Sequence, residues 1–374
     1  MKICIASDFH LSYRQYGLEA REYDFYNQYD KLINSIIKEK PDLFIELGDI
    51  FDEPKPKPIA IKVFENGLDK LIDNDIKCYG IVGNHTLIHR KNYYPIDCIF
   101  SGKLNILDND YVIFDDVFVG GVTYHSKTGN IKNVIDELYE KSINCRLKIL
   151  LLHQGLKTDI KFGYDFDEEC LKLNRFDYIF LGHIHKKILR KNDNTIYNYV
   201  GSLNSCNVTE MLDEMENGKG YTILDTDNLS LKRKTIYNER KYIEFNLNDD
   251  NLNDDLIEEI CVKLNEFSIK PIVRLNISSK DHIHIYEKCK ILEKYSLIVL
   301  KHKIVSFNNK FESIKGNDIK FGVEKIVREK FKTEWESDFC LDLMYLLGSG
   351  HVKEAKELAD NIYNQKFKGG DING

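Results

Sequence analysis

The sequence lacks any long apolar run. None of its hydrophobic stretches approaches the ~18 consecutive apolar residues that a membrane-spanning helix requires. The apolar stretch at residues 3–6 ends at Ser7-Asp8, which is too short for the hydrophobic region of a secretory signal peptide. Internal repeats and low-complexity blocks are also missing. We therefore expect a soluble globular protein of the cytoplasm, without a membrane partner.

Paired cysteines are lacking as well. Nine cysteines are scattered along 374 residues with no Cys-x-x-Cys pair, and most have apolar neighbours, as Cys4 does between Ile3 and Ile5. An odd number of unclustered cysteines is typical of reduced, buried thiols. The pattern argues against a disulfide framework and against a zinc ribbon.

An excess of basic charge is missing too. The chain has 53 Lys and Arg against 60 Asp and Glu, a formal net charge of −7. This balance excludes a uniformly basic protein that wraps nucleic acid, although it leaves local basic patches open. A content of 43% hydrophobic and 30% charged residues favours a globular chain over a disordered one. At ~150 residues per domain, the length predicts two or three domains.

Strand and helix patterns alternate over the first half of the chain. We expect helices at 19–40 and 58–72, and short apolar strands at 3–7, 43–47, 79–82, 147–152 and 178–181. This order predicts an α/β domain with central β-sheets flanked by helices. From residue 194 to about 238, strands without intervening helices are expected, for example at 197–200 and 221–224.

The composition changes after residue 240. The polar stretch 246–255 predicts a turn and a helix start, and one helix (256–267) and strands at 272–277 and 297–300 should follow. Residues 306–317 have the composition of a linker, and helical patterns return at 323–331, 339–347 and 352–362. The predicted organisation is therefore 1–240 as the main domain, 241–304 as a small α+β domain, 305–320 as a linker and 321–374 as a helical tail.

Short polar motifs follow five of the predicted strands. They are Asp8-Phe9-His10, Gly48-Asp49-Ile50-Phe51-Asp52, Gly83-Asn84-His85, His153 and Gly182-His183-Ile184-His185. Strands of one sheet deliver the residues at their carboxyl ends to a common rim. Seven potential ligands would then converge: Asp8, His10, Asp49, Asn84, His153, His183 and His185. Oxygen donors mixed with imidazoles suit Mn, Fe or Zn in a dinuclear centre, and the absence of cysteine argues against a structural zinc site.

Each motif alone is a weak signal. The pair His282-Ile283-His284 shows this, because it lacks a preceding glycine and partner motifs, and we interpret it as structural. Five motifs in one order, each at a strand end, make coincidence a poor explanation. The combination indicates a functional metal centre.

The set of motifs resembles the calcineurin-like metallophosphoesterase superfamily. Further strings resemble one branch, the Mre-eleven (SbcD-type) nuclease of DNA double-strand-break repair in its archaeal form; they lie at residues 11–16, 152–155, 181–186, 199–203 and 363–369. The resemblance implies a layered calcineurin-like core. It also implies that 241–304 is a capping, DNA-binding domain and that 321–374 is a helical element that docks on an ATPase.

The resemblance also implies roles for the site residues. One metal ion would be held by Asp8, His10, Asp49 and His185, and the other by Asp49, Asn84, His153 and His183. The cofactors would be two Mn²⁺ per subunit, bridged by Asp49, and His85 would be a catalytic histidine that binds no metal. This chain differs from the family pattern at Thr86, where an acidic residue is common, and at Asp52, where some members have histidine. Asp52 is a candidate hydrogen-bond acceptor for a ligand imidazole.

Basic residues border these motifs and predict contacts with a polyanionic backbone. They are Arg14, Lys55, Lys57, Arg90, Lys91, Lys186 and Lys187. By resemblance the chain would be a nucleoid-associated, manganese-dependent homodimer, acting as a 3′–5′ exonuclease on double-stranded DNA and an endonuclease on single strands. Its partner would be a Rad-fifty (SbcC-type) coiled-coil ATPase.

Two alternatives remain open. A phosphomonoesterase or cyclic-nucleotide phosphodiesterase would use the same metals, but would leave the residues after Asn238 and the basic rim unexplained. A non-catalytic DNA-end scaffold would be favoured by missing ligands, yet all seven ligands are present.

Overall fold

The computed structural model describes residues 1–86, 100–125, 131–159, 164–278 and 282–303, together with 328, 334–348, 356 and 358–359 near the C-terminus. By contacts the chain divides into two compact units. The first comprises residues 1–160 and 164–304, and the second comprises 305–374 with the short segment 161–163. Each unit is described by itself.

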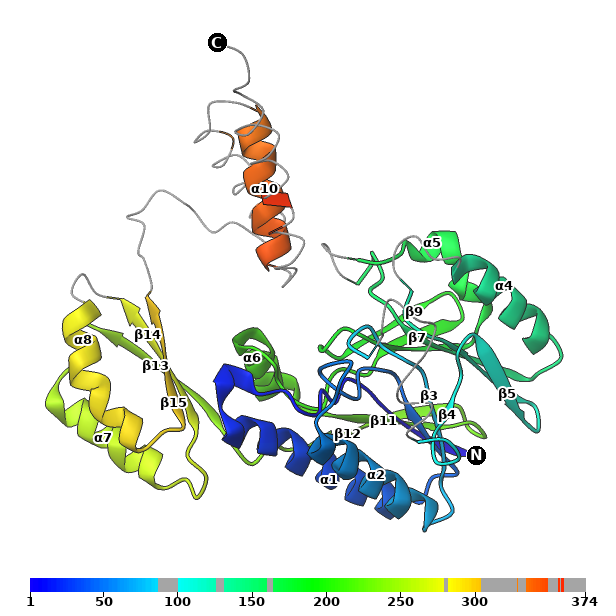
Figure 1. Ribbon diagram of the computed structural model, residues 1–374, viewed down its shortest axis with the longest axis horizontal. Helices are drawn as coiled ribbons and strands as arrows, with labels where there is room; N and C mark the ends of the chain where they lie inside the picture. Colours follow the sequence, from blue (N-terminus) through cyan, green and yellow to red (C-terminus); the bar gives the residue numbers. More distant parts are fainter. Residues whose placement is uncertain are drawn as a thin grey trace. The chain divides into compact units, whose positions relative to one another are not determined.

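Two six-stranded sheets form the larger part of the first unit (Figure 1). The first sheet has the order β12-β11-β1-β2-β3-β4, in which β1 to β4 are parallel and β11 pairs antiparallel with both β1 and β12. The second has the order β5-β6-β7-β8-β10-β9, in which β6, β7, β8 and β10 are parallel. The bounds in the first sheet are β1 Lys2–Ala6, β2 Leu43–Glu46, β3 Lys77–Gly80, β4 Asn105–Ile106, β11 Lys219–Asp225 and β12 Ser230–Ile236. Those in the second are β5 Asp110–Phe114, β6 Val117–Val122, β7 Leu147–His153, β8 Tyr178–Gly182, β9 Ile188–Asn192 and β10 Thr195–Tyr199.

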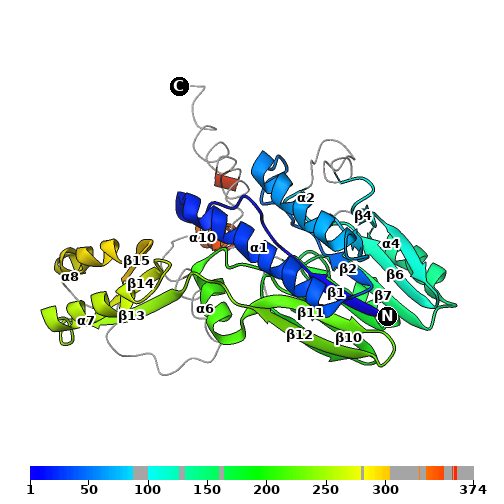
Figure 2. The ribbon, with the colours of Figure 1, turned by 90° about the horizontal axis from the view of Figure 1, so that it is seen from below.

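Helices cover the outer faces of the two sheets. Helices α1 (Glu19–Glu39) and α2 (Pro58–Ile72) lie side by side on the first sheet (Figure 2). Helices α4 (Ile131–Ser142) and α5 (Glu168–Leu171) belong to the second. Successive strand residues point to opposite faces, so Phe44 packs toward the helices while Ile45 packs between the sheets. The result is a four-layered α/β/β/α core.

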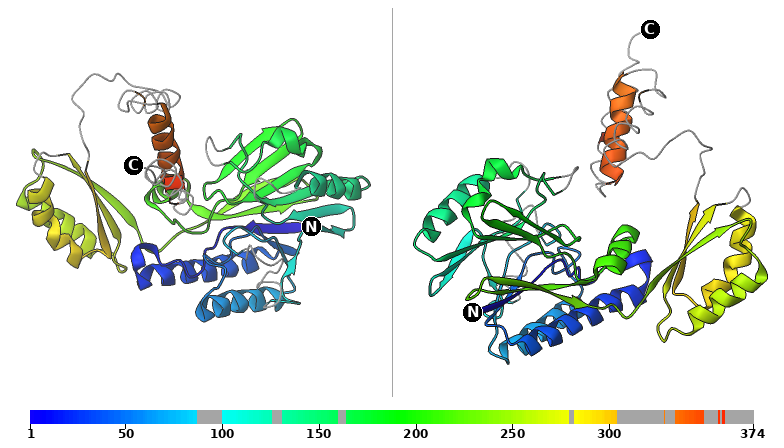
Figure 3. Two further views of the ribbon diagram at one scale, coloured as in Figure 1. Left: turned by 45° about the horizontal axis from the view of Figure 1, so that its top comes forward. Right: turned by 180° about the vertical axis from the view of Figure 1, so that it is seen from behind.

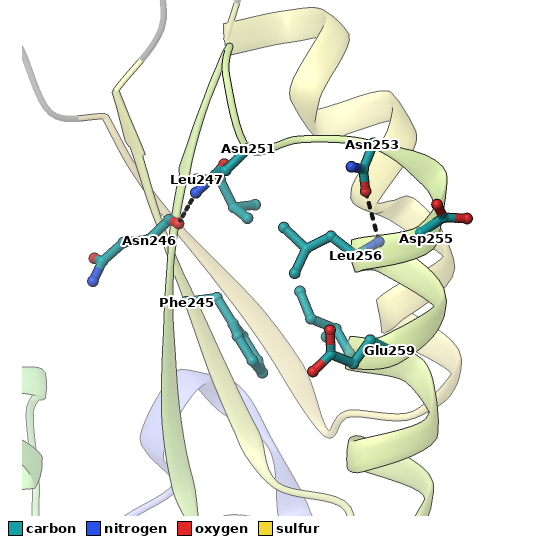
Figure 4. A pocket seen from close by; sticks show the side chains of 9 residues that line it. Phe245, Asn246, Leu247, Asn251, Asn253, Asp255, Leu256 and Glu259 are labelled. Atoms are coloured by element: carbon teal, nitrogen blue, oxygen red, sulfur yellow. Dashed lines mark hydrogen bonds between the residues drawn. The ribbon is translucent and has the colours of Figure 1, made fainter.

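A smaller three-stranded sheet completes the first unit. It consists of the parallel strands β13 (Tyr242–Asn248), β14 (Ile272–Ser278) and β15 (Ile298–Lys303). Helices α7 (Asp254–Asn265) and α8 (His282–Cys289) lie on one face of it (Figure 3). A pocket opens between β13 and the start of α7 (Figure 4), where the Asn253 side chain accepts a hydrogen bond from the Leu256 amide. That bond caps the helix and explains why α7 begins at this point.

The second unit contains helix α10 (Glu334–Gly348). The predicted helix at 339–347 lies within it. The expected linker and the predicted helices at 323–331 and 352–362 fall outside the described residues, apart from residue 328 and residues 356, 358 and 359, which are helical.

Several expectations were wrong in detail. Helix α6 (Val208–Asn217) interrupts the segment where only strands were expected, because Asn207 accepts a hydrogen bond from the Glu210 amide and caps a helix there. Strand β13 continues to Asn248, within the segment expected to be a turn, because pairing with β14 provides hydrogen-bond partners for its backbone. Helix α8 was also unforeseen, since its eight residues are too few for a clear periodic pattern. Its first turn contains His282 and His284.

The described cysteines agree only in part with the expectation of buried thiols. The eight described cysteines are unpaired; Cys4, Cys78, Cys261 and Cys289 are buried, whereas Cys170 is exposed, contrary to the expectation of buried thiols. Within the described ranges, no helix is both long enough and apolar enough to cross a membrane.

Candidate metal centre

The polar motifs meet at one edge of the two sheets, at the carboxyl ends of the parallel strands. Asp8, Asp49 and Asn84 follow β1, β2 and β3 of the first sheet, and His153 and His183 come at the ends of β7 and β8 of the second. The sheets are joined at this edge, because the ring of His153 bonds through Nδ1 to the Leu47 carbonyl at 2.6 Å. This explains why ligands from two sheets share one site.

One group of side chains gathers around His153. Its Nε2 lies 3.1 Å from Asp49 Oδ2 and 3.1 Å from Asn84 Oδ1. His183 Nδ1 approaches the same Asn84 oxygen to 3.0 Å. Two imidazoles, a carboxylate and an amide oxygen therefore point toward a common centre.

A second group gathers around His10 and His185. Their Nε2 atoms are 3.0 Å apart, and Asp8 Oδ1 lies 3.9 Å from the Nε2 of His185. Asp49 Oδ2, which contacts His153, is also 4.0 Å from His10 Nε2. The same carboxylate oxygen therefore faces both groups, and all seven predicted ligands are brought together.

The backbone of this rim adopts unusual conformations. Asp8, His10, Asp49 and His183 all have positive φ, at 54°, 46°, 55° and 79°. Such left-handed conformations are uncommon outside glycine and concentrate at functional sites. They place side chains of the Asp8-x-His10 motif at one centre, although alternate residues of a regular strand would point apart.

Two glycines are required by close contacts. A Cβ on Gly48, which has a φ of +98°, would lie 2.4 Å from His153 Nδ1. A Cβ on Gly83 would lie 2.3 Å from Asp49 Oδ1. Any larger residue at either position would displace a candidate ligand.

Burial strongly perturbs these groups. Asp8, Asp49 and His153 are each at most 2% exposed. Burial alone would raise the pKa of Asp49, but the neighbouring His153 outweighs it and lowers this pKa. For His153, burial acts to lower the pKa, and the Asp49 carboxylate raises it to about 9. For His183, burial and the charge of His153 lower the pKa to about 4. Buried carboxylates crowded with imidazoles are what divalent cations stabilise, so the donor set fits a dinuclear centre.

His85 lies differently from the seven candidate ligands. Its ring is 41% exposed and packs edge-on against the ring of His10, with centroids 4.7 Å apart. Its Nδ1 lies 2.8 Å from the backbone carbonyl of Asp52, while its backbone amide donates to Asp49 Oδ1 at 2.9 Å. The ring borders the second group, because potential ligand atoms of His10, Asp52 and His85 all lie within 4.8 Å of one another.

The two positions that differ from the family pattern have clear partners. Asp52 Oδ1 lies 3.2 Å from His10 Nδ1, so the hydrogen bond considered for it is present. Thr86 is buried, and its hydroxyl donates to the Gly83 carbonyl at 3.1 Å. It braces the turn that carries Asn84.

Glu210 is a site residue that the sequence did not reveal. Its Oε1 lies 3.1 Å from His185 Nδ1, and His185, Cys206 and Glu210 form a further cluster of potential ligand atoms. Burial would raise the pKa of Glu210, but the hydrogen bond from His185 lowers it to about 2. The spacing Asn207-x-x-Glu210 signals a capped helix, but nothing in it points to His185.

Three of the predicted DNA-contacting residues form ion pairs within the chain. Arg14 and Lys57 both pair with Glu22, at 2.9 Å and 2.6 Å, and Lys186 lies 3.5 Å from Asp213. Lys55 and Lys187 are exposed, whereas Arg90 and Lys91 lie outside the described residues. Their role in DNA binding stays a prediction.

Comparison with known proteins decides the family. The family model described as calcineurin-like phosphoesterase matches residues 1–187, half of the chain, and this range includes all seven candidate ligands. The DNA double-strand break repair protein Mre11 of Methanocaldococcus jannaschii is 30% identical over 97% of this chain and 98% of that protein. The chain belongs to the Mre11 family of calcineurin-like phosphoesterases.

Other Mre11 relatives agree with this placement. The protein from Methanococcus maripaludis is 33% identical over 60% of this chain and 63% of its own length. The protein from Sulfolobus acidocaldarius is 27% identical over 98% of this chain and 95% of its own. The resemblance and the α/β fold class expected from the sequence are thus confirmed. Members of the calcineurin-like family bind a dinuclear metal centre.

Proposed function

We propose that this chain is a manganese-dependent DNA nuclease of double-strand-break repair. The observation that carries the proposal is the convergence of seven oxygen and imidazole donors in a chain of the Mre11 family, with Asp49 facing both groups. When bound, two divalent ions activate water and stabilise the charge that develops during in-line attack on a phosphodiester.

The geometry supports the expected division of the ligands. Asp8, His10 and His185 serve one ion, and Asn84, His153 and His183 serve the other. Asp49 belongs to both, because its Oδ2 is 3.1 Å from His153 Nε2 and 4.0 Å from His10 Nε2. The buried carboxylates also balance the charge of the two ions.

His85 is the proposed proton donor to the leaving oxygen. A backbone carbonyl can only accept a hydrogen bond, so the contact with the Asp52 carbonyl leaves the proton on His85 Nδ1. Nε2 then carries the second proton of the imidazolium form, and this is the proton that His85 gives to the leaving oxygen. General acid catalysis of this kind contributes roughly 10²–10⁴-fold.

The remaining roles are proposed from the family. The exposed Lys55 and Lys187 track the DNA backbone, together with Arg90 and Lys91. The substrates are duplex ends, cut 3′ to 5′, and single strands, cut internally. The enzyme acts as a homodimer, and the tail that includes α10, with Met344 49% exposed, docks on a Rad-fifty (SbcC-type) ATPase.

A substrate comparison tests the proposal. The unmodified protein is incubated with end-labelled duplex DNA, single-stranded DNA, a cyclic nucleotide and p-nitrophenyl phosphate, with and without Mn²⁺. We expect manganese-dependent cleavage of both DNA substrates, and its loss in Asp49→Asn, which preserves side-chain size. Hydrolysis of the small esters alone would assign the site to a phosphomonoesterase or cyclic-nucleotide phosphodiesterase. Binding of metal without any hydrolysis would favour a scaffold.

A further inference from the structure

His185 is held by residues that lie beyond the matched phosphoesterase range of 1–187. Its ring Nδ1 is 3.1 Å from Oε1 of Glu210 in the first turn of α6. Its backbone carbonyl is 3.1 Å from Nζ of Lys219, at the start of β11. The ring and the backbone carbonyl of His185 are therefore both held by residues from the later part of the chain.

The two oxygens of Glu210 have different partners. Oε2 accepts at 2.8 Å from the amide of Cys206, one residue before the N-cap Asn207, a contact close to that of a capping box. Oε1 accepts from the Asn207 side-chain amide at 2.5 Å and also faces His185. A capping role thus explains Oε2 but leaves the contact between Oε1 and the imidazole unexplained.

The contact determines which nitrogen of His185 carries the proton. A carboxylate oxygen can only accept a hydrogen bond. Nδ1 of His185, which faces Oε1 of Glu210, is therefore the donor. In the neutral imidazole Nε2 is then the nitrogen without a proton, and it points toward Asp8 and His10. This is the tautomer that a metal ion requires at Nε2.

Lys219 restrains the same ligand through its main chain. The side chain is only 2% exposed, and besides the His185 carbonyl it donates to the Ser202 hydroxyl at 3.0 Å. The Ser202 amide also donates to that carbonyl, at 3.1 Å. With the carbonyl fixed, the ring of His185 has little freedom to leave Glu210.

We infer that Glu210 is a positioning residue, which orients His185 toward one of the two metal ions by accepting the hydrogen bond from its Nδ1. The inference deepens the proposed function and rests on it only in that His185 is a metal ligand. Partners of metal-ligating histidines typically change metal affinity 10–100-fold when they are replaced. The effect should fall on one ion, because among the seven ligands Glu210 contacts only His185 in the described part of the chain.

Equilibrium metal binding tests this inference without any substrate. Metal-free full-length protein is titrated with Mn²⁺, and bound ion is measured by electron paramagnetic resonance and calorimetry. Glu210→Gln is expected to weaken one of two Mn²⁺ sites roughly 10–100-fold and to leave the other unchanged.

Glu214→Gln is the matched control. Glu214 lies one turn further along α6 and accepts from the Ser205 hydroxyl at 2.6 Å and the Asn238 amide at 2.5 Å. The Glu214→Gln variant loses a carboxylate of the same helix that contacts no imidazole. Its Mn²⁺ affinity should therefore match that of the unmodified protein. Equal affinities in the Glu210 and Glu214 variants would overturn the inference.

The manganese dependence of turnover separates positioning from folding. A positioning role predicts that Glu210→Gln needs more Mn²⁺ but recovers most of kcat at saturating metal, with little change in Tm. A loss of kcat at every Mn²⁺ concentration, with a lower Tm, would mean that Glu210 only supports the helix and would overturn the inference. If the unmodified chain binds two ions with the expected Glu210 dependence but cleaves no DNA, the proposed function fails while the inference stands.

Discussion

Glu46 provides a test of how the fold accommodates a buried carboxyl group near the candidate metal centre. It is the last residue of β2, it is fully buried at 0% exposure, and neither of its oxygens has a hydrogen-bond partner among the described residues. Gly80 on the adjacent strand makes room for it, since a Cβ there would lie 3.3 Å from Glu46 Oε2. Burial raises the pKa of Glu46 well above its usual value, with His153 opposing this effect.

The magnitude follows from linkage between protonation and folding. A carboxyl group that is protonated more readily in the native state adds stability below its ordinary pKa of 4.5, and this stability is lost as the pH rises through the native pKa. Protonating an ordinary carboxyl group at pH 7 costs about 3.4 kcal/mol, at about 1.36 kcal/mol for each of the 2.5 pH units above 4.5, and this is the upper limit of the penalty. Glu46→Gln removes the titration and keeps the shape and an unpartnered polar end. We therefore expect it to stabilise the metal-free protein by about 1–3 kcal/mol at pH 7.

The assay compares the pH dependence of unfolding. Urea and thermal unfolding are measured in a chelator at pH 7 and at pH 4, for the unmodified chain and for Glu46→Gln. A rise in Tm of roughly 1–2 °C per kcal/mol is expected at pH 7, and the difference should shrink toward zero at pH 4. Glu53→Gln, at an exposed position, is the control and should stay within about 0.5 kcal/mol. A Glu46→Gln variant that is less stable at pH 7 would refute the reasoning, because it would mean that the ionised carboxylate has a stabilising partner.

Three further predictions concern the proposed nuclease. Asp49→Ala should abolish manganese-dependent DNA cleavage in a folded protein, because its carboxylate faces both ligand groups; residual cleavage above a few per cent would contradict a dinuclear site. His85→Ala should keep both metal ions by elemental analysis but lose roughly 10²–10⁴-fold in turnover, and metal depletion would instead make His85 a ligand. Deletion from Gly322 onward should spare cleavage of short oligonucleotides, because every ligand lies before Val200, but should abolish co-purification with the partner ATPase. Tight binding of the truncated chain to the ATPase would show that the docking site lies elsewhere.

Local sequence patterns were sufficient for elements with a strong period. Helix α1 follows from the spacing of Phe25, Tyr29, Leu32 and Ile36, which are all buried. The strands β1, β2 and β7 follow from short apolar runs that are buried on both faces. By contrast, α8 and β13 gave weak local signals, because eight residues show no clear helical period and β13 has a polar end that its neighbour stabilises.

The candidate ligands could be named from the sequence because each follows a strand, and the carboxyl ends of parallel strands share an edge. The sequence alone thus determined the fold class, the family and a set of residues for the site. Only the tertiary structure decided how these residues are held, because that depends on contacts between distant segments. Glu210 reaches His185 across 25 positions of the chain, and Lys219 fixes its carbonyl across 34. Neither contact leaves a periodic or spaced pattern, since only the packing of α6 and β11 against the β8 loop brings these atoms together.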